Sequence, residues 1–96
     1  MFAVIFTAEL NELDIDYYVI ANRMRELAIN EYGCVDLTSV AEDGKELTVS
    51  YWHQKEQIVH WKQNKEHIEA QQKGKDKWYK NYKVEIVEIL HAYKND

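Results

Sequence analysis

The segment Asp43-Gly44-Lys45 separates two runs that are rich in apolar and β-branched residues, CVDLTSVAE and ELTVSYWH. Asp and Gly both tolerate the positive φ angles that a two-residue hairpin turn requires. The pattern therefore predicts a β-hairpin, and a two-residue loop would fix its register, whereas a longer loop would shift it. The facing pairs are then Val40 with Leu47, Thr38 with Val49, and Val35 with Trp52.

The segments on either side of this hairpin predict two further strands and two helical regions. Residues 2–8, FAVIFTA, are typical of a strand. Asp14 is placed to cap a helix, and Gly33 is placed to end it. Residues 54–75 are helical in composition, with an interruption near Asn64 and an end at Gly74, and residues 81–93 predict the last strand. The first helix buries a stripe of residues at three- and four-residue steps: Tyr17, Ile20, Ala21, Met24, Leu27 and Ala28.

The element order is β-α-β-β-α-β, which is typical of ferredoxin-like α+β domains. We therefore expect an antiparallel four-stranded sheet with two main helices on one face. The chain contains no proline, no internal repeat and no recognisable linker. A single domain over residues 1–96 is the expectation.

Both faces of the predicted sheet carry apolar side chains, although a sheet with one face in water should alternate apolar and polar residues. Two helices can cover only one face. The other face of such a sheet can be covered by the same face of a second copy, which predicts a two-fold homodimer. One face carries Val40, Leu47, Val49 and Tyr51, and the other Val35, Leu37, Ala41 and Trp52; the last strand adds Tyr82, Val84, Ile86 and Leu90 against Val87, Ile89 and Tyr93.

Composition and charge exclude several classes of function. The formal net charge is −5, which disfavours a nucleic-acid partner, and the lysines of the second half alternate with acids as on a solvated helix face. No apolar run is long enough to cross a membrane, and the N-terminal run reads as a strand and not as a signal peptide. Cys34 is the only cysteine, so a small buried side chain in a reducing cytoplasm is the expectation.

Metal, nucleophile and phosphate sites also lack support in the sequence. His53, His60 and His67 are seven residues apart, so neighbours on one helix would be roughly 10 Å apart along its axis, too far for one ion. No Gly-x-Ser-x-Gly elbow and no glycine-rich phosphate loop is present. The sequence therefore predicts no metal and no cofactor.

With this topology, three segments resemble the antibiotic biosynthesis monooxygenase (ABM) superfamily of dimeric α/β barrels. They are AVIF in the first strand, LTVSYW before the second helix, and IVHWKQNKEHIEAQQKGKDKWYKNY after it. The resemblance covers nearly the whole chain and implies the fold more strongly than a reaction. The superfamily includes cofactor-independent oxygenases of phenols and quinols, haem-degrading enzymes and many proteins of unknown role.

The haem-degrading branch is disfavoured by the residues at its functional positions. Those relatives place an axial histidine ten residues after a helix tryptophan that Trp61 matches, and this chain has Gln71 there. They also place an asparagine in the first strand, and residues 2–9 contain none. Glutamine is a poor haem ligand. The polyketide-type oxygenases resemble the chain at Trp52, but their neighbouring asparagine and tyrosine fall on Thr48 and Val49.

An aromatic pocket is the remaining interpretation of the second half of the chain, with simple core packing of the same rings as the alternative. In the pocket interpretation, His67 is the candidate base, since a neutral histidine can take a phenolic proton. Two functions stay open: a cofactor-independent monooxygenase of a small aromatic or quinol-type compound, and a non-enzymatic dimer that binds a small hydrophobic metabolite. The candidate pocket residues are Trp52, Trp61, Ile68, Gln71, Trp78, Tyr79 and Tyr82.

Overall fold

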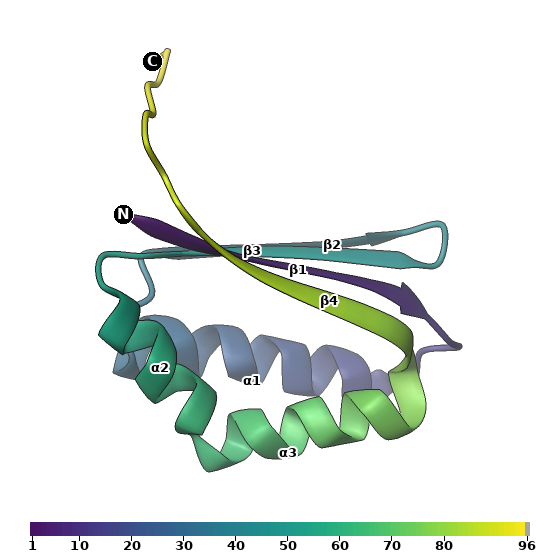
Figure 1. The fold of residues 1–96 in the computed structure, drawn as a ribbon. Coiled ribbons are helices and arrows are strands. Elements are labelled where there is room, and N and C mark those ends of the chain that lie inside the picture. Colours follow the sequence, from purple (N-terminus) through teal and green to yellow (C-terminus); the bar gives the residue numbers. More distant parts are fainter. Residues whose placement is uncertain (96) are drawn as a thin grey trace.

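The computed structural model describes residues 1–95 and has the expected α+β, ferredoxin-like fold (Figure 1). Four antiparallel strands form one sheet in the order β2-β3-β1-β4, and the helices lie together on one of its faces. Asp96, the last residue of the predicted domain, lies outside the described residues. The elements are β1 (Phe2–Leu10), α1 (Ile15–Glu31), β2 (Asp36–Glu42), β3 (Lys45–Trp52), α2 (Lys55–Gln63), α3 (Lys65–Lys73), the π-helical turn η1 (Gly74–Trp78) and β4 (Tyr79–Glu88).

The hairpin between β2 and β3 has the predicted two-residue loop. Asp43 and Gly44 adopt φ angles of 52° and 72°, which is the positive region that the turn requires. Val40 faces Leu47 and Thr38 faces Val49, so the predicted register is confirmed. The register also determines that Glu46 points to the same face of the sheet as Thr48 and Ser50.

Helix α1 begins and ends where the sequence predicts. The Asp14 side chain accepts a hydrogen bond from the backbone N–H of Tyr17, and Gly33 follows the helix with a φ of 82°. Of the predicted stripe, Tyr17, Leu27 and Ala28 are buried. The helix therefore lays this side against the sheet.

The predicted interruption near Asn64 is confirmed as a break between α2 and α3. Asn64 is extended, with φ −64° and ψ 132°, and its side-chain oxygen accepts a hydrogen bond from the backbone N–H of His67. Its amide nitrogen donates to the Tyr32 hydroxyl at 2.8 Å. The Asn64 side chain thus caps the start of α3 and connects the break between the helices to Tyr32, at the end of α1.

Helix α3 ends at Lys73 with Gly74 as its C-cap, as predicted, but a π-helical turn follows it directly. Gly74 is itself α-helical, with φ −60° and ψ −48°, and the chain continues through η1 to Trp78. A Cβ atom at this position would lie 2.5 Å from Cε2 of Tyr79. The glycine is needed for the close approach of the Tyr79 ring and not for a left-handed turn.

The last strand is also shifted from its predicted range of residues 81–93. It begins at Tyr79 and ends at Glu88, which pairs with Phe2 at the start of β1. Beyond that point β1 offers no further strand partner, and a single bond from the Ile89 N–H to the Met1 carbonyl follows at 3.0 Å. Residues 89–95 then run away from the sheet on the side opposite the helices (Figure 1).

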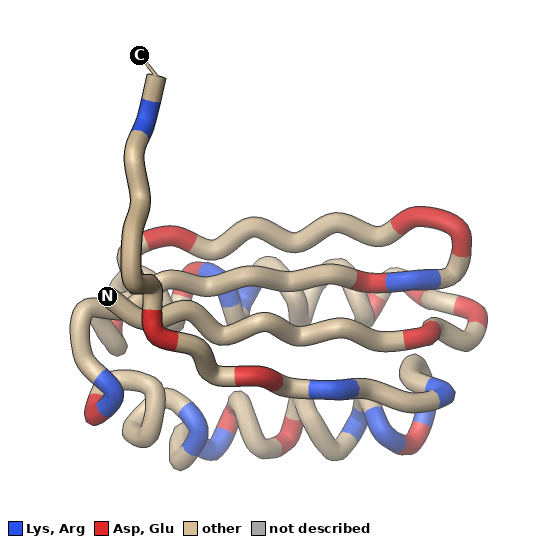
Figure 2. Tube along the Cα trace, turned by 45° about the horizontal axis from the view of Figure 1, so that its top comes forward, with Lys and Arg blue, Asp and Glu red and all other residues tan. Residues whose placement is uncertain are grey.

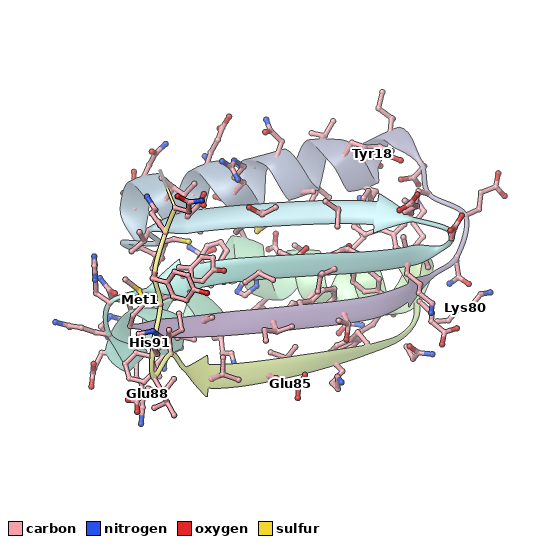
Figure 3. The ribbon with its side chains drawn as sticks, turned by 90° about the horizontal axis from the view of Figure 1, so that it is seen from above. Met1, Tyr18, Lys80, Glu85, Glu88 and His91 are labelled. Carbon is pink, nitrogen blue, oxygen red and sulfur yellow. The ribbon has the colours of Figure 1, made fainter. Side chains whose placement is uncertain are left out.

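The core lies between the helices and one face of the sheet, and no helix covers the other face (Figures 1 and 3). Cys34 is buried, as predicted, and burial raises the pKa of its thiol. Charged residues of β1, β2 and β3 lie at the strand ends, and their middles carry none (Figure 2). The core cluster consists of Leu27, Ala28, Cys34, Trp52, Ile58 and Trp61. None of the helices formed by residues 1–95 has the length and apolar character of a membrane span; the cytoplasmic location stays a prediction.

Candidate functional site

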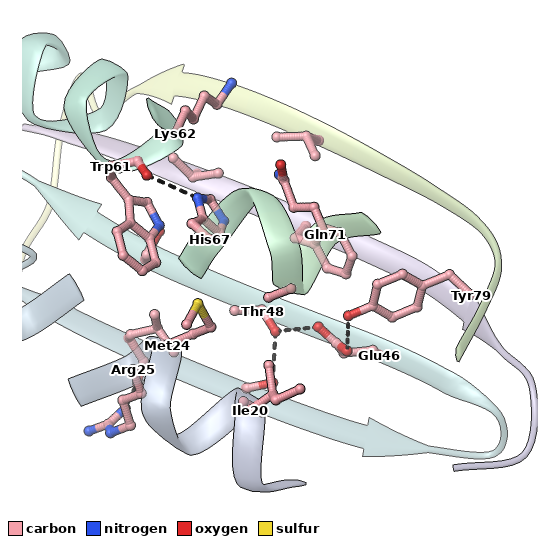
Figure 4. Close-up of a pocket in the computed structure, with 18 of the residues that line it drawn as sticks. Ile20, Met24, Arg25, Glu46, Thr48, Trp61, Lys62, His67, Gln71 and Tyr79 are labelled. Carbon is pink, nitrogen blue, oxygen red and sulfur yellow. Dashed lines mark hydrogen bonds between the residues drawn. The ribbon is translucent and has the colours of Figure 1, made fainter. Parts of the chain in front are cut away.

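A cavity of about 190 Å³ lies between the helix-covered face of the sheet and the helices (Figure 4). Every strand contributes to its floor, α1 forms one wall, and α2, α3 and the η1–β4 junction form the other. Its lining is mostly apolar, with Val4, Phe6, Ile20, Met24 and Val84 among the contributors. A concave, mostly apolar space with a few polar groups is typical of a small-molecule site.

Five of the eight sequence-predicted site residues line this cavity: Trp61, His67, Gln71, Trp78 and Tyr79. The other three lie elsewhere. Trp52 is fully buried in the core and donates from Nε1 to Ser50 Oγ at 2.9 Å. The placement of Ile68 on the inner side of the second helical region was wrong, because the break at Asn64 rotates α3 and leaves Ile68 49% exposed. Tyr82 stacks on Phe6 beside the cavity and is also exposed.

His67 lies in the first turn of α3, stacked on the Trp61 indole. The ring centroids are 4.3 Å apart and the planes differ by 12°. Nδ1 lies 3.1 Å from the carbonyl oxygen of Trp61, which can only accept, so Nδ1 carries the proton. In the neutral ring, Nε2 then holds the free lone pair.

The environment of His67 favours its neutral form. Burial lowers the pKa of the imidazole below its usual 6.5; the bond to the Trp61 carbonyl partly opposes this effect, and nearby Lys62 adds to it. Nε2 has no hydrogen-bond partner among residues 1–95, and no fully buried polar side-chain atom there lacks one. Nε2 is therefore accessible and unpartnered on a side chain that lines the cavity, as a proton acceptor needs to be.

A second polar group, the carboxylate of Glu46, lies on the cavity wall towards the Tyr79 end (Figure 4). Its residue is only 7% exposed. Tyr17 and Tyr79 donate to Oε1 at 2.5 Å and 3.2 Å, and Thr48 donates to Oε2 at 2.7 Å. Three hydroxyl groups thus converge on one carboxylate, which satisfies the requirement that a buried charge be hydrogen-bonded.

Burial and the adjacent Glu46 carboxylate raise the pKa of both tyrosines, Tyr17 and Tyr79. Both side chains therefore remain protonated donors across the physiological range. Sequence reasoning missed Glu46 as a site residue. The available signal was the hairpin register, which places this acidic residue on the same face as Leu37 and Trp52, where a carboxylate is unusual.

Trp78 also lines the cavity, and its orientation is fixed from two sides. Its Nε1 donates to the Asp14 carboxylate at 3.1 Å, and its ring meets the Tyr17 ring edge-on at 5.4 Å. Asp14 also pairs with Lys77 at 2.6 Å, and this pairing lowers the pKa of the Asp14 carboxyl group. Asp14 therefore caps α1 and also holds the Trp78 indole that lines the cavity.

Within residues 1–95, no group of three or more histidine, cysteine, aspartate or glutamate side chains is arranged to hold a metal ion. The residues around the cavity also do not fit haem. Gln71, at the position that the resemblance assigns to the axial ligand, offers an amide and no imidazole. The arrangement can bind a small aromatic molecule and accept a proton from it.

Comparison with models of protein families finds no match. The chain is 39% identical to the uncharacterised protein YqjZ of Bacillus subtilis over 89 residues, which are 92% of this chain and 78% of that protein. It is 27% identical over 100 residues to jasmonate monooxygenase ABM of Pyricularia oryzae. That alignment covers 100% of this chain and 46% of the relative, so the chain spans less than half of the relative's length.

Solved structures share the fold at low sequence identity. SnoaB, a cofactor-independent oxygenase from Streptomyces nogalater, superposes with a TM-score of 0.82 at 7% identity, over 98% of this chain and 97% of that one. A candidate antibiotic biosynthesis monooxygenase from Nitrosomonas europaea gives 0.78 at 16% identity, over 95% and 100%. The identity to YqjZ over most of both chains places this chain in the same family as that protein, and the solved structures show that it shares the fold of antibiotic biosynthesis monooxygenases.

Proposed function

We propose that this protein is a cofactor-independent monooxygenase of a small phenol or quinol, with His67 as the base. The observation that carries the proposal is the state of His67: its Nδ1 proton is committed to the Trp61 carbonyl, its Nε2 has no hydrogen-bond partner among residues 1–95, and its side chain lines the cavity. The names of two similar proteins, a cofactor-independent oxygenase and a jasmonate monooxygenase, support this class of reaction.

The proposed reaction begins when Nε2 of His67 takes the proton of a quinol hydroxyl. The quinolate transfers one electron to O2, and the resulting semiquinone and superoxide combine, so that a bond forms between a ring carbon and one oxygen atom. The proton held by His67 returns to the outer oxygen and gives a ring hydroperoxide. Its O–O bond then breaks with loss of water from that carbon, which leaves one new oxygen on the ring. In total, a quinol and O2 give a hydroxyquinone and water, and the substrate supplies all four electrons, so no external reductant is required.

The size of the cavity limits the ligand. A dry apolar cavity of about 150 Å³ holds one benzene molecule in a well-studied engineered protein. The cavity here is about 190 Å³ and communicates with the solvent. Trp61 and His67 at one end and Tyr79 at the other provide flat walls, so an aromatic compound of one or two rings is the proposed substrate.

An oxygen electrode tests the proposal. The purified protein is mixed with a panel of mono- and bicyclic phenols and quinols, and the wild type is compared with His67→Gln, which keeps a polar side chain but lacks a basic nitrogen. We expect oxygen uptake with at least one quinol, reduced about a hundredfold or more in the variant. Thermal stabilisation by these compounds without oxygen uptake would instead identify the protein as a binding module for a small hydrophobic metabolite.

We also propose that the open face of the sheet is covered by a second copy of the chain. Val40, Leu47 and Val87 are 54%, 43% and 37% exposed on that face. Residues 89–95 project from the same side, with Leu90 and Tyr93 at 89% and 85% exposure (Figures 1 and 3). In a two-fold pair, each apolar tail has the partner's apolar sheet face within reach, so both exposed surfaces are buried together.

A further inference from the structure

The proposed reaction uses His67 but gives no role to Glu46, the buried carboxylate of the same cavity. No ion pair formed by residues 1–95 includes Glu46. A buried carboxylate without a cation is costly unless hydrogen bonds replace its hydration. Glu46 is therefore a candidate for ligand recognition in the cavity that it lines.

The hydrogen bonds around Glu46 all run in one direction. Thr48 donates to Glu46, so the 2.7 Å contact between the Ser39 and Thr48 hydroxyls is a donation from Ser39 to Thr48. Tyr17 and Tyr79 donate to the other carboxylate oxygen. Three hydroxyls therefore donate to the carboxylate directly and Ser39 donates to one of them, so none of the four protons is free for a ligand.

This network leaves capacity for one further donor. A carboxylate has about four lone-pair positions, two on each oxygen. Oε1 receives two bonds, from Tyr17 and Tyr79, whereas Oε2 receives one, from Thr48. The unused position is on Oε2, and Glu46 lines the cavity. A ligand group that donates a hydrogen bond can occupy it, and an anionic group cannot.

Glu46 and His67 lie towards opposite ends of the cavity (Figure 4). Glu46 is near the start of β3, four residues before Ser50, which corresponds to roughly 13 Å along the strand. His67 stacks on Trp61, which belongs to the core cluster around Trp52 at the other end of β3. A flat ligand that extends between them meets a proton acceptor at each end.

We propose that Glu46 is a specificity-determining residue that accepts a hydrogen bond from a hydroxyl group at the end of the ligand remote from His67. The ligand class is then an aromatic diol, and aromatic carboxylates are rejected at the Glu46 end. This inference rests on the proposed function only for the placement of the other hydroxyl at His67. Tyr17 and Tyr79 act as positioning residues, since they hold the carboxylate and do not reach the ligand through a free donor.

Three naphthalenes that differ only in the remote substituent test the proposal: 2,6-dihydroxynaphthalene, 2-naphthol and 6-hydroxy-2-naphthoate. Binding is measured by quenching of the intrinsic fluorescence, since Trp61 and Trp78 line the cavity. The wild type should bind the diol about tenfold or more tighter than 2-naphthol, as expected for a hydrogen bond to a charged group, and the naphthoate should bind weakest. Equal affinities, no binding of the diol, or tightest binding of the naphthoate would each overturn the proposal.

Two variants assign the selectivity to this residue. In Glu46→Gln the charge is removed at nearly constant shape, so the preference for the diol over the naphthoate should fall about tenfold or more. Glu42→Gln removes an equal charge from the exposed end of the same hairpin and should leave the ranking unchanged. An unchanged ranking in a folded Glu46→Gln protein would contradict the proposal, and if that variant does not fold, the wild-type ranking decides alone.

The binding series tests the role of Glu46, and the oxygen electrode tests the monooxygenase activity. Either proposal can therefore fail without the other. Diol selectivity without oxygen uptake would retain the role of Glu46 and remove the proposed monooxygenase activity. Oxygen uptake from phenols without discrimination at the remote substituent would retain the monooxygenase activity and remove the role of Glu46.

Discussion

The His67 imidazole lies flat on the Trp61 indole, at 4.3 Å between centroids, and donates from Nδ1 to the carbonyl of the same residue. Trp61 thus fixes both the plane and the tautomer of the histidine. The side chain and the carbonyl can act together because α2 ends just after Trp61 and the chain turns at Asn64 before α3 begins. The break between the helices is therefore the structural basis of the proposed base.

The proposed base should be visible in the pH dependence of catalysis. A base acts when deprotonated, and burial lowers the pKa of His67 below its usual 6.5. The rate kcat/KM should therefore rise with pH and reach its plateau below the range of an unperturbed histidine. An acid limb above pH 6.5, or an identical limb in His67→Gln, would exclude His67 as the base.

The same lowered pKa predicts a stability change. The folded protein disfavours the protonated imidazole, so the unfolded chain binds more protons between its own pKa, near 6.5, and the lower folded value. The free energy of unfolding should fall as pH drops through this window. Chemical denaturation of the wild type and His67→Gln at several pH values checks this, and a similar pH dependence in both would count against it.

Asn64→Ala should destabilise the protein and displace the base. The Asn64 side chain caps α3 through the His67 N–H at 2.9 Å and reaches the Tyr32 hydroxyl at 2.8 Å. Loss of an N-cap costs about 0.5–2 kcal/mol. Urea denaturation measures the loss, and Gln63→Ala, an exposed neighbour, is the control, with a change within about 0.5 kcal/mol. Equal stabilities of the two variants would show that the cap has no role.

Gly74→Ala should also destabilise the protein, although alanine is usually more stable than glycine in a helix. Gly74 has helical angles, so alanine would ordinarily gain about 0.4–1 kcal/mol. The new Cβ would lie 2.5 Å from the Tyr79 ring, whose hydroxyl is bonded to Glu46, and overpacking of this kind costs about 1–3 kcal/mol. A net loss in thermal and urea unfolding is expected, with Lys75→Ala close to the wild type. A more stable Gly74→Ala protein would contradict the rigid placement of Tyr79.

Light scattering coupled to size exclusion tests the proposed dimer. The wild type should elute with twice the 11.5 kDa mass of the chain. Leu47→Lys replaces an exposed apolar side chain of the open face by a charged one and should give the monomer. Val59→Lys adds the same charge at a residue of α2 that is 50% exposed and should remain dimeric. A monomeric wild type would remove this proposal.

The sequence predicted the parts of the fold that depend on local chemistry. Asp43-Gly44 determined the hairpin register, Asp14 and Gly33 marked the ends of α1, and Asn64 marked the break between α2 and α3. Gly74 was predicted as the end of the helix but not as a site of close approach, because a glycine that ends a helix and a glycine that admits a neighbouring ring look the same in sequence. The difference is the position of Tyr79, five residues later, which only the tertiary structure supplies.

The candidate site was predictable in part for a similar reason. His67 and Gln71 are four residues apart on α3, so their common side could be anticipated. The fully buried position of Trp52 and the exposure of Ile68 depend on how α2 and α3 turn relative to the sheet. Glu46 was missed because its importance comes from Tyr17, 29 residues before it, and Tyr79, 33 residues after it.

The most direct test of the account is incorporation of labelled oxygen. The metal-free protein, treated with a chelator and supplied with no flavin or haem, is incubated with an aromatic quinol under ¹⁸O₂. We predict that each product molecule gains one labelled oxygen atom, that the second appears in water, and that the yield falls about a hundredfold in His67→Gln. An unlabelled product, or oxygen consumption that His67→Gln leaves unchanged, would contradict the account.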